Sequence, residues 1–108
     1  LRRGAVKSVL ESSRIAREAK LIEELFREIA TGGKAAYGIA EVQKAMNYGA
    51  IESLLVLDEF ARRGDVDDIM RQVGNSRGKV IVFSSEFEPG DRLASLGGVA
   101  ALLRFKIA

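Results

Sequence analysis

Two pairs of carboxylates stand where acid–base chemistry could occur. Asp58 and Glu59 follow one apolar run of the sequence, and Glu86 and Glu88 follow another. If both runs are strands, the pairs lie where open α/β sheets bind their ligands, beyond the carboxyl ends of the strands. Two carboxylates can act as acid and base when burial separates their pKa values. Neighbouring arginines, and the absence of His and Cys as catalytic partners, argue against catalysis here.

Ser84 and Ser85 raise the question of a nucleophilic serine. Such a serine needs an activating base, and because the chain has no His, Lys is the remaining choice. Lys79 begins the strand that we predict just before the serines, so it should lie at the opposite end of that strand. We therefore predict that these serines form a cap or a turn.

Two glycine pairs, Gly32-Gly33 and Gly97-Gly98, could suggest a phosphate-binding loop. A phosphate loop needs Gly-Lys-Ser/Thr opening a helix after a strand. Here Gly97 and Gly98 follow a predicted helix and open a strand, the reverse order. We predict that both pairs end helices.

Length and composition exclude several other classes of protein. The 108 residues suit one domain, and the net charge of +2 comes from 17 basic and 15 acidic groups of interspersed sign. A nucleic-acid binder usually concentrates its positive charge on a patch. Without Cys or His we expect no disulfide, metal or cofactor, and a cytoplasmic location. No apolar run reaches the roughly 18 residues of a membrane span, so we expect no contact with a membrane.

A long amphipathic helix opens the predicted fold. Ser8 and Glu11 form a capping box, which predicts a helix from Ser8 to Ala30. Its apolar stripe contains Ile15, Ala19, Leu21, Ile22, Leu25, Phe26 and Ile29. Three pairs with a spacing of four, Arg14–Glu18, Lys20–Glu24 and Glu23–Arg27, are predicted to support one another on the outer face.

The rest of the chain alternates between strands and helices. We predict strands at 35–37, 51–57, 79–83 and 99–105, and helices from Ile39 to Gly49, over 66–73 and over 91–96. The runs 51–57 and 79–83 are apolar enough to be buried on both faces. Pro89 and Gly90 are predicted to turn the chain. This order predicts an α/β layered domain with a mixed or parallel sheet.

Phe87 and Arg104 are the side chains most typical of a recognition surface. Phe87 lies between two acids in a predicted loop, whereas the other aromatics are predicted to be mostly core. Arg104 is the only charge in the run 99–105, so it must reach the surface or a carboxylate such as Glu52. Both interpretations stay open from the residues alone.

Two long segments resemble the C-terminal domain of the Pelota family, archaeal and eukaryotic relatives of the class 1 peptide-chain release factor. They are AYGIAEVQKAMNYGAIESLLVLD (36–58) and KVIVFSSEFEPGDRLASLGGVAALLRF (79–105), and the Gly32-Gly33-Lys34 turn agrees. The resemblance covers about residues 12–106. It implies a three-layer α/β/α sandwich with a small mixed sheet, similar in fold to the ribosomal proteins that bind RNA kink-turns. Residues 1–12 would be the end of a preceding central domain or a linker, and 13–108 the domain itself.

The resemblance implies a docking role in ribosome rescue rather than catalysis. The parent protein would enter the empty A site of a stalled ribosome in no-go and nonstop mRNA surveillance. An elongation-factor-1-alpha-type GTPase would deliver it, and an ATP-binding-cassette recycling ATPase would help to split the subunits. The release-factor family places its GTPase contact in the segment that corresponds to Leu103-Arg104-Phe105. The residues expected to bind partners are Glu86, Phe87, Glu88, Pro89, Gly90 and Arg104.

Alternatives to the Pelota reading follow from the same resemblance. One is domain 3 of a class 1 release factor acting in translation termination, and the other is a kink-turn-type RNA-binding module. The release-factor relative carries a Gly-Gly-Gln loop in its central domain, which residues 1–108 would not include. Phe87 stands where relatives often carry His, so this chain departs from the family pattern in its predicted recognition loop.

Overall fold

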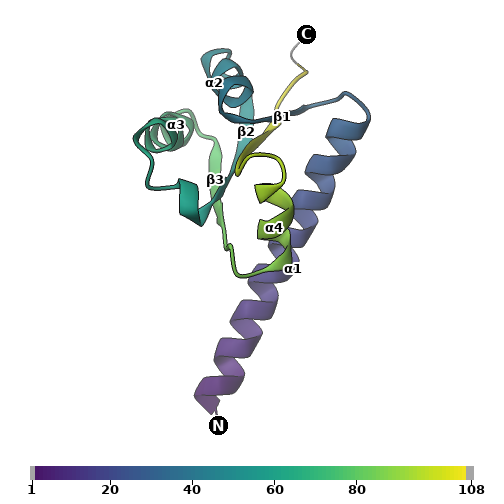
Figure 1. Cartoon of the computed structure of the whole chain (residues 1–108), viewed down its shortest axis with the longest axis vertical. Helices are drawn as coiled ribbons and strands as arrows, with labels where there is room; N and C mark the ends of the chain where they lie inside the picture. Colours follow the sequence, from purple (N-terminus) through teal and green to yellow (C-terminus); the bar gives the residue numbers. More distant parts are fainter. Residues whose placement is uncertain (1, 107–108) are drawn as a thin grey trace.

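The computed structural model describes the backbone of residues 2–106 and the side chains of residues 12–106. Helices and strands alternate along the chain (Figure 1). The elements are α1 (Arg2–Ala30), β1 (Ala35–Tyr37), α2 (Ile39–Asn47), β2 (Ile51–Leu57), the short 3-10 helix η1 (Asp58–Phe60), α3 (Gly64–Asn75), β3 (Lys79–Phe83), α4 (Glu88–Ala94) and β4 (Val99–Leu103).

The four strands form one mixed sheet in the order β1-β4-β2-β3. β2 and β3 run parallel, whereas β4 is antiparallel to both β1 and β2. The last strand of the sequence therefore lies inside the sheet, and all five of its residues are buried. The register between β2 and β4 shifts between Ile51 and Ser53, which leaves Glu52 exposed. The predicted mixed sheet is confirmed.

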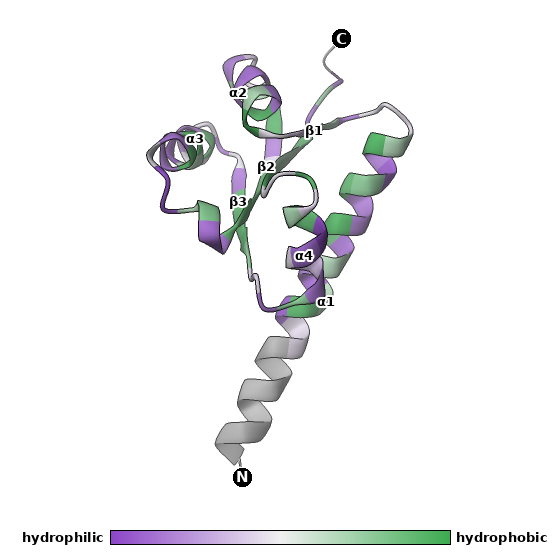
Figure 2. Ribbon diagram, in the orientation of Figure 1, coloured by the Kyte–Doolittle hydropathy of each residue, from purple (hydrophilic) through white to green (hydrophobic). Residues whose placement is uncertain are grey.

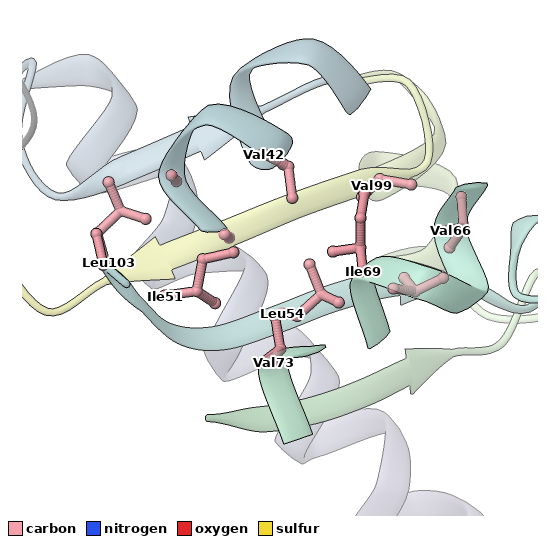
Figure 3. Packing of buried hydrophobic residues seen from close by; sticks show 12 residues of the cluster. Val42, Ile51, Leu54, Val66, Ile69, Val73, Val99 and Leu103 are labelled. Carbon is pink, nitrogen blue, oxygen red and sulfur yellow. The ribbon is translucent and has the colours of Figure 1, made fainter. Parts of the chain in front are cut away.

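Helices cover both faces of this sheet, which gives the predicted three layers. On one face α2 and α3 pack against β2 and β4 through a cluster that includes Val42, Leu54, Ile69 and Val99 (Figure 3). On the other face α1 and α4 pack through a second cluster that includes Ile22, Leu55, Phe83, Leu93 and Leu102.

The long helix α1 contributes its predicted apolar stripe to the second cluster. Ile22 and Leu25 are completely buried, and apolar and polar residues alternate along the helix (Figure 2). The predicted start at Ser8 is wrong, because α1 begins at Arg2 and Ser8 lies within it. The side chains of Ser8 and Glu11 lie outside the described residues. The proposed domain boundary after residue 12 stays a prediction.

Strand β3 is less buried than its sequence predicts. Its apolar run 79–83 was expected to be covered on both faces, but β3 is the outer strand of the sheet and only Phe83 is buried. An apolar run favours a strand both in the middle and at the edge of a sheet. Whether a strand lies at the edge depends on which other strands pair with it, and the residues of the strand itself do not show this. No helix in the described part of the chain is both long and apolar enough to cross a membrane.

Candidate docking surfaces

The six residues predicted to bind partners lie at two opposite ends of the sheet. Glu86 to Gly90 follow β3, whose last residue pairs with Leu57 at the end of β2. Arg104 follows β4, whose last residue pairs with Ile51 at the start of β2. The length of β2 separates the two ends by about 20 Å. The six residues therefore belong to two separate surfaces.

The first surface, which we call the acidic corner, consists of Glu86, Phe87 and Glu88. The Ser84 hydroxyl accepts a hydrogen bond of 3.1 Å from the Glu86 N–H, so the turn predicted for Ser84 is confirmed. Helix α4 begins at Glu88, not at residue 91, and the predicted turn at Pro89-Gly90 is wrong. Proline fits the first turn of a helix because the N–H that it lacks has no partner there.

Pro89 and Gly90 are buried, so they support the acidic corner from inside and offer no surface to a partner. Gly90 packs directly on the backbone of Ser84, and a Cβ atom at this position would overlap the Ser84 carbonyl oxygen. Only glycine therefore allows α4 to start this close to the end of β3.

An ion pair between the exposed Arg14 and the buried Glu18 ties α1 to the end of β3, where the acidic corner begins. Glu18 is 1% exposed, and it accepts hydrogen bonds from Arg14 Nε at 2.8 Å and from the Ser84 N–H at 3.4 Å. Arg14 also donates to the Val82 carbonyl at 3.2 Å. The sequence predicts the Arg14–Glu18 pair correctly, but its placement of Glu18 on the outer face is wrong.

The other two predicted pairs on α1 do not form ion pairs within residues 12–106. These are Lys20 with Glu24 and Glu23 with Arg27. Glu18 is buried, unlike the glutamates of these pairs, because the Ser84 N–H just after β3 donates a hydrogen bond to it. The spacing of four along a helix cannot reveal such a partner, since Ser84 is distant in the sequence.

Asp58 is held in its charged form by the loop after β3. Its Oδ2 accepts hydrogen bonds from the Ser85 N–H at 3.2 Å and from the Ser85 hydroxyl at 3.3 Å. Burial raises the pKa of Asp58, but these hydrogen bonds, the Glu59 N–H and the charge of Arg14 together lower it below its ordinary value of 3.8. A carboxylate stabilised in this way is a poor general acid at neutral pH.

A hollow of about 420 Å³ lies beside Asp58 and is lined by Glu59, Arg62 and Ser85. The structure thus brings Asp58 close to the loop after β3, as the parallel strand ends predict. Ser85 lies between the two predicted carboxylate pairs and bonds to Asp58, a role that the sequence did not reveal. The geometry around Asp58 serves to hold the ends of β2 and β3 together.

The second surface, which we call the arginine end, consists of Tyr48, Arg104 and Phe105. β4 ends at Leu103, so the predicted strand through Phe105 is two residues too long. Arg104 donates from Nε to the Ile51 carbonyl at 3.2 Å and from Nη2 to the Ser76 carbonyl at 3.0 Å. The ion pair considered between Arg104 and Glu52 does not form in the described part of the chain. Backbone carbonyls orient the guanidinium but do not neutralise its charge.

Exposed aromatic side chains lie at the arginine end. Tyr48 is 60% exposed and Phe105 is 49% exposed. The Arg104 N–H donates to the Ala50 carbonyl at 2.7 Å, which places the segment carrying Phe105 beside the α2–β2 turn that carries Tyr48. Phe87, predicted to be the exposed aromatic, lies at the N-cap of α4 and is half-buried, so it is less exposed than predicted.

The exposure of Tyr48 and Phe105 was not predicted, because the aromatics other than Phe87 were expected to be mostly core; Phe105 entered only through the resemblance, in the segment 103–105 expected to contact the GTPase. Their positions carried a usable signal. Tyr48 precedes a glycine at the end of a predicted helix, and Phe105 comes directly after the charged Arg104. Aromatic residues at element ends have no neighbours along the element to cover them. Tyr37, at the end of β1, is likewise 48% exposed.

These features define an α/β/α domain with two polar ends, in which Asp58, Ser84 and Ser85 take part in hydrogen bonds that hold the ends of β2 and β3 together. The sequence model of the family described as eRF1 domain 3 matches residues 15–107. The chain therefore belongs to the eRF1 domain 3 family. A protein pelota homolog from Methanothrix thermoacetophila is 60% identical over 107 residues, which are 99% of this chain and 31% of that protein. The chain thus spans about a third of the length of the curated relatives that it matches.

Solved structures with the same fold agree with this assignment. Archaeoglobus fulgidus Pelota matches 97% of this chain, and 34% of its own, with a TM-score of 0.91 and 51% identity. A model of ribosome-bound archaeal Pelota and ABCE1 matches all of this chain, and 31% of its own, with a TM-score of 0.83 and 47% identity. The resemblance to the C-terminal domain of Pelota is confirmed.

A more distant match is Saccharomyces cerevisiae Dom34, described as a translation termination-like factor involved in RNA quality control pathways and interacting with Hbs1. It matches 94% of this chain, and 30% of its own, with a TM-score of 0.83 and 29% identity. The fold is therefore shared between archaeal and yeast proteins.

Proposed function

We propose that this chain is the protein-docking domain of a ribosome-rescue factor. In this role it contacts a translational GTPase of the elongation-factor-1-alpha type and an ATP-binding-cassette recycling ATPase, and it has no catalytic activity of its own. Family membership and the similarity to the C-terminal domain of Pelota support this proposal. The model of ribosome-bound archaeal Pelota and ABCE1 supports action on the ribosome, and the description of Dom34 supports a role in RNA quality control. We propose no-go and nonstop mRNA surveillance, with recycling of stalled ribosomes, as the pathway.

The arginine end carries the proposal for the GTPase contact. Arg104 keeps an uncompensated charge on a rigid support of two backbone carbonyls, and the exposed rings of Tyr48 and Phe105 lie at the same end. Arginine and aromatic residues are the types that most often dominate the free energy of protein–protein binding. A charge that is already oriented loses little conformational entropy when it meets a carboxylate of the partner.

The acidic corner is proposed as a second contact surface. Glu86 and Glu88 are exposed, and Phe87 is partly accessible between them. Charges at the rim of an interface mainly affect the rate and orientation of association. We therefore expect the acidic corner to contribute less to affinity than the arginine end, with Pro89 and Gly90 acting only as its internal support.

Binding of the whole chain to the purified elongation-factor-type GTPase, measured by calorimetry, tests this function. We expect Arg104→Ala to weaken binding by at least about tenfold, which corresponds to about 1.4 kcal/mol. Arg71→Ala on the exposed face of α3 is the control and should bind as wild type does. Equal binding by wild type and by a folded Arg104→Ala variant would contradict the proposed GTPase contact.

A further inference from the structure

A groove runs between α1 and the outer edge of the sheet, and none of its lining residues belongs to the two proposed docking surfaces. It has a volume of about 550 Å³. Its apolar lining comes from Leu21 of α1 and Ile81 of β3, which are half-buried, and Val80 borders the groove although its side chain packs on the other face of the sheet. The groove exists because α1 crosses the face of the sheet, while β3 forms the outer edge (Figure 1).

The edge of β3 is protected at one end only. The outer strand of a sheet presents unpaired N–H and C=O groups on its free side. Arg14 occupies this side near the end of β3, where it donates to the Val82 carbonyl. Because successive residues of a strand alternate, Val80 presents its N–H to the same side as Val82. The part of the edge that borders the groove, Lys79–Ile81, therefore has room for about three residues of a second strand.

Positive charge surrounds this open part of the edge. Arg17 and Lys20 of α1 and Lys79 of β3 line the groove and are exposed, against one carboxylate, Glu24. None of the three cations forms an ion pair within residues 12–106. An occupant of the groove therefore meets an excess of two positive charges next to free backbone groups.

We propose that this groove binds a short, extended, acidic segment of a protein partner, which adds to the sheet as a strand beside β3. The backbone of the segment would pair with Val80. Its acids would face Arg17, Lys20 and Lys79 on the α1 side of the sheet, and its alternate, apolar side chains would cover Val80 on the other face. Strand addition suits this site because main-chain hydrogen bonds supply affinity, while pockets for alternate side chains supply selectivity. The excess positive charge selects for acidic sequences.

The probe for this site is a fluorescent seven-residue peptide in which glutamate and valine alternate. We expect it to bind the whole chain, and we expect the double variant Arg17→Glu/Lys20→Glu to bind about tenfold more weakly or worse. Lys44→Glu is the control. It reverses one charge, as each of the two substitutions does, but it lies on α2 at the opposite face of the sheet, and it should leave peptide binding unchanged. A matched peptide with lysine in place of glutamate should not bind.

A second measurement tests the main-chain contact separately from charge. Amide exchange of the wild-type chain, followed by nuclear magnetic resonance, should slow at Val80 by at least about tenfold when the acidic peptide saturates the site. Val80→Pro removes this N–H and should abolish peptide binding, while Val80→Ala keeps the N–H and should retain most of it. The exchange result stands even where Val80→Pro prevents folding, because it uses the wild-type chain.

Several outcomes would overturn the proposal. Absence of peptide binding, or binding that Arg17→Glu/Lys20→Glu leaves unchanged, excludes an acidic segment in this groove. Competition by a single-stranded RNA oligonucleotide through the same cations would indicate a nucleic-acid site instead. Concentration-dependent self-association lost in Val80→Pro would indicate a second copy of the chain. None of these results affects the GTPase contact, because Arg104 does not line the groove and Arg104→Ala tests that contact separately.

Discussion

The two ends of the sheet use their charged groups in opposite ways. At the end that carries the acidic corner, Glu18 and Asp58 are engaged from within, by Arg14 and by the backbone and side chains of Ser84 and Ser85. At the arginine end, Arg104 donates to two backbone carbonyls and forms no ion pair within residues 12–106. The comparison teaches that density of charged residues does not identify a docking surface. We infer that an unpaired charge held in a fixed orientation beside exposed aromatic rings is the better indicator.

The aromatic side chains follow the same division. Phe87 at the acidic corner is half-buried at a helix N-cap, whereas Tyr48 and Phe105 at the arginine end are 60% and 49% exposed. Large exposed rings next to an oriented arginine are costly to a protein that has no partner for them. We therefore expect the arginine end to be the main recognition surface and the acidic corner the weaker of the two.

The largest effect is expected from a substitution that loosens both ends together. Leu102 lies in the interior strand β4, is 5% exposed and packs in the cluster beneath α1 and α4. Leu102→Ala should lower the free energy of unfolding by about 2–5 kcal/mol, because it removes buried methyl groups and leaves a cavity. Chemical denaturation measures this, and a loss below about 1 kcal/mol would mean that the strand is not packed in the interior.

A smaller effect, confined to the acidic corner, is expected from Gly90→Ala. The added methyl group would overlap the Ser84 carbonyl oxygen, so α4 must shift, at a cost of about 1–3 kcal/mol. Gly74→Ala is the matched control, because a Cβ at Gly74 meets no atom and the φ angle is not positive there. It should be neutral or stabilising by about 0.4–1 kcal/mol. Equal melting temperatures for the two variants would show that the close approach at Gly90 is not required.

The ion pair between Arg14 and Glu18 is tested by Glu18→Gln, which keeps the shape of the side chain and removes its charge. We expect a loss of about 1–2 kcal/mol, because the hydrogen bonds from Arg14 and from the Ser84 N–H lose their ionic component. Glu23→Gln changes an exposed residue of the same helix and should stay within about 0.5 kcal/mol of wild type. If both variants are equally stable, α1 is not held to β3 by this pair.

The smallest effect is expected in the pH dependence of stability. The pKa of Asp58 is lowered in the folded chain, so its contribution to stability is complete above its ordinary value of 3.8 and is lost as the pH falls through the lower folded value. Asp58→Asn should therefore reduce the loss of stability of the chain on acidification below that pH. Denaturation curves collected across the acidic range measure this. An unchanged acid dependence in Asp58→Asn would mean that Ser85 does not stabilise the charged carboxylate.

Much of the fold could be predicted from the sequence, since most elements have strong periodic patterns. The apolar stripe of α1, the strand at 51–57 and the glycine stop at Gly97-Gly98 all appear as expected. Gly98 illustrates why the last was clear: its φ angle is +83°, and Phe60 leaves no room for a side chain. Where the backbone needs a conformation that other residues rarely adopt, the sequence has a glycine, so such positions can be predicted from the sequence.

The candidate site was predicted less well because it depends on contacts between distant segments. The order of strands decides that Arg104 and Glu86 lie at opposite ends, and nothing in the run Phe83–Phe105 encodes that order. The burial of Glu18 depends on a backbone N–H that comes 66 residues later. The start of α4 was predicted too late because Pro89 was interpreted as part of a turn. Proline is also common in the first turn of a helix, which is where Pro89 lies.

The most direct test of the central claim is a double-mutant cycle for GTPase binding. Wild type, Arg104→Ala, Phe87→Ala and the double variant are compared by calorimetry, with circular dichroism to verify that each is folded. Since the two ends are about 20 Å apart, the two losses of binding free energy should add, with the larger loss, at least about 1.4 kcal/mol, from Arg104→Ala. A folded Arg104→Ala variant that binds as tightly as wild type, or a larger loss from Phe87→Ala, would contradict the assignment of recognition to the arginine end.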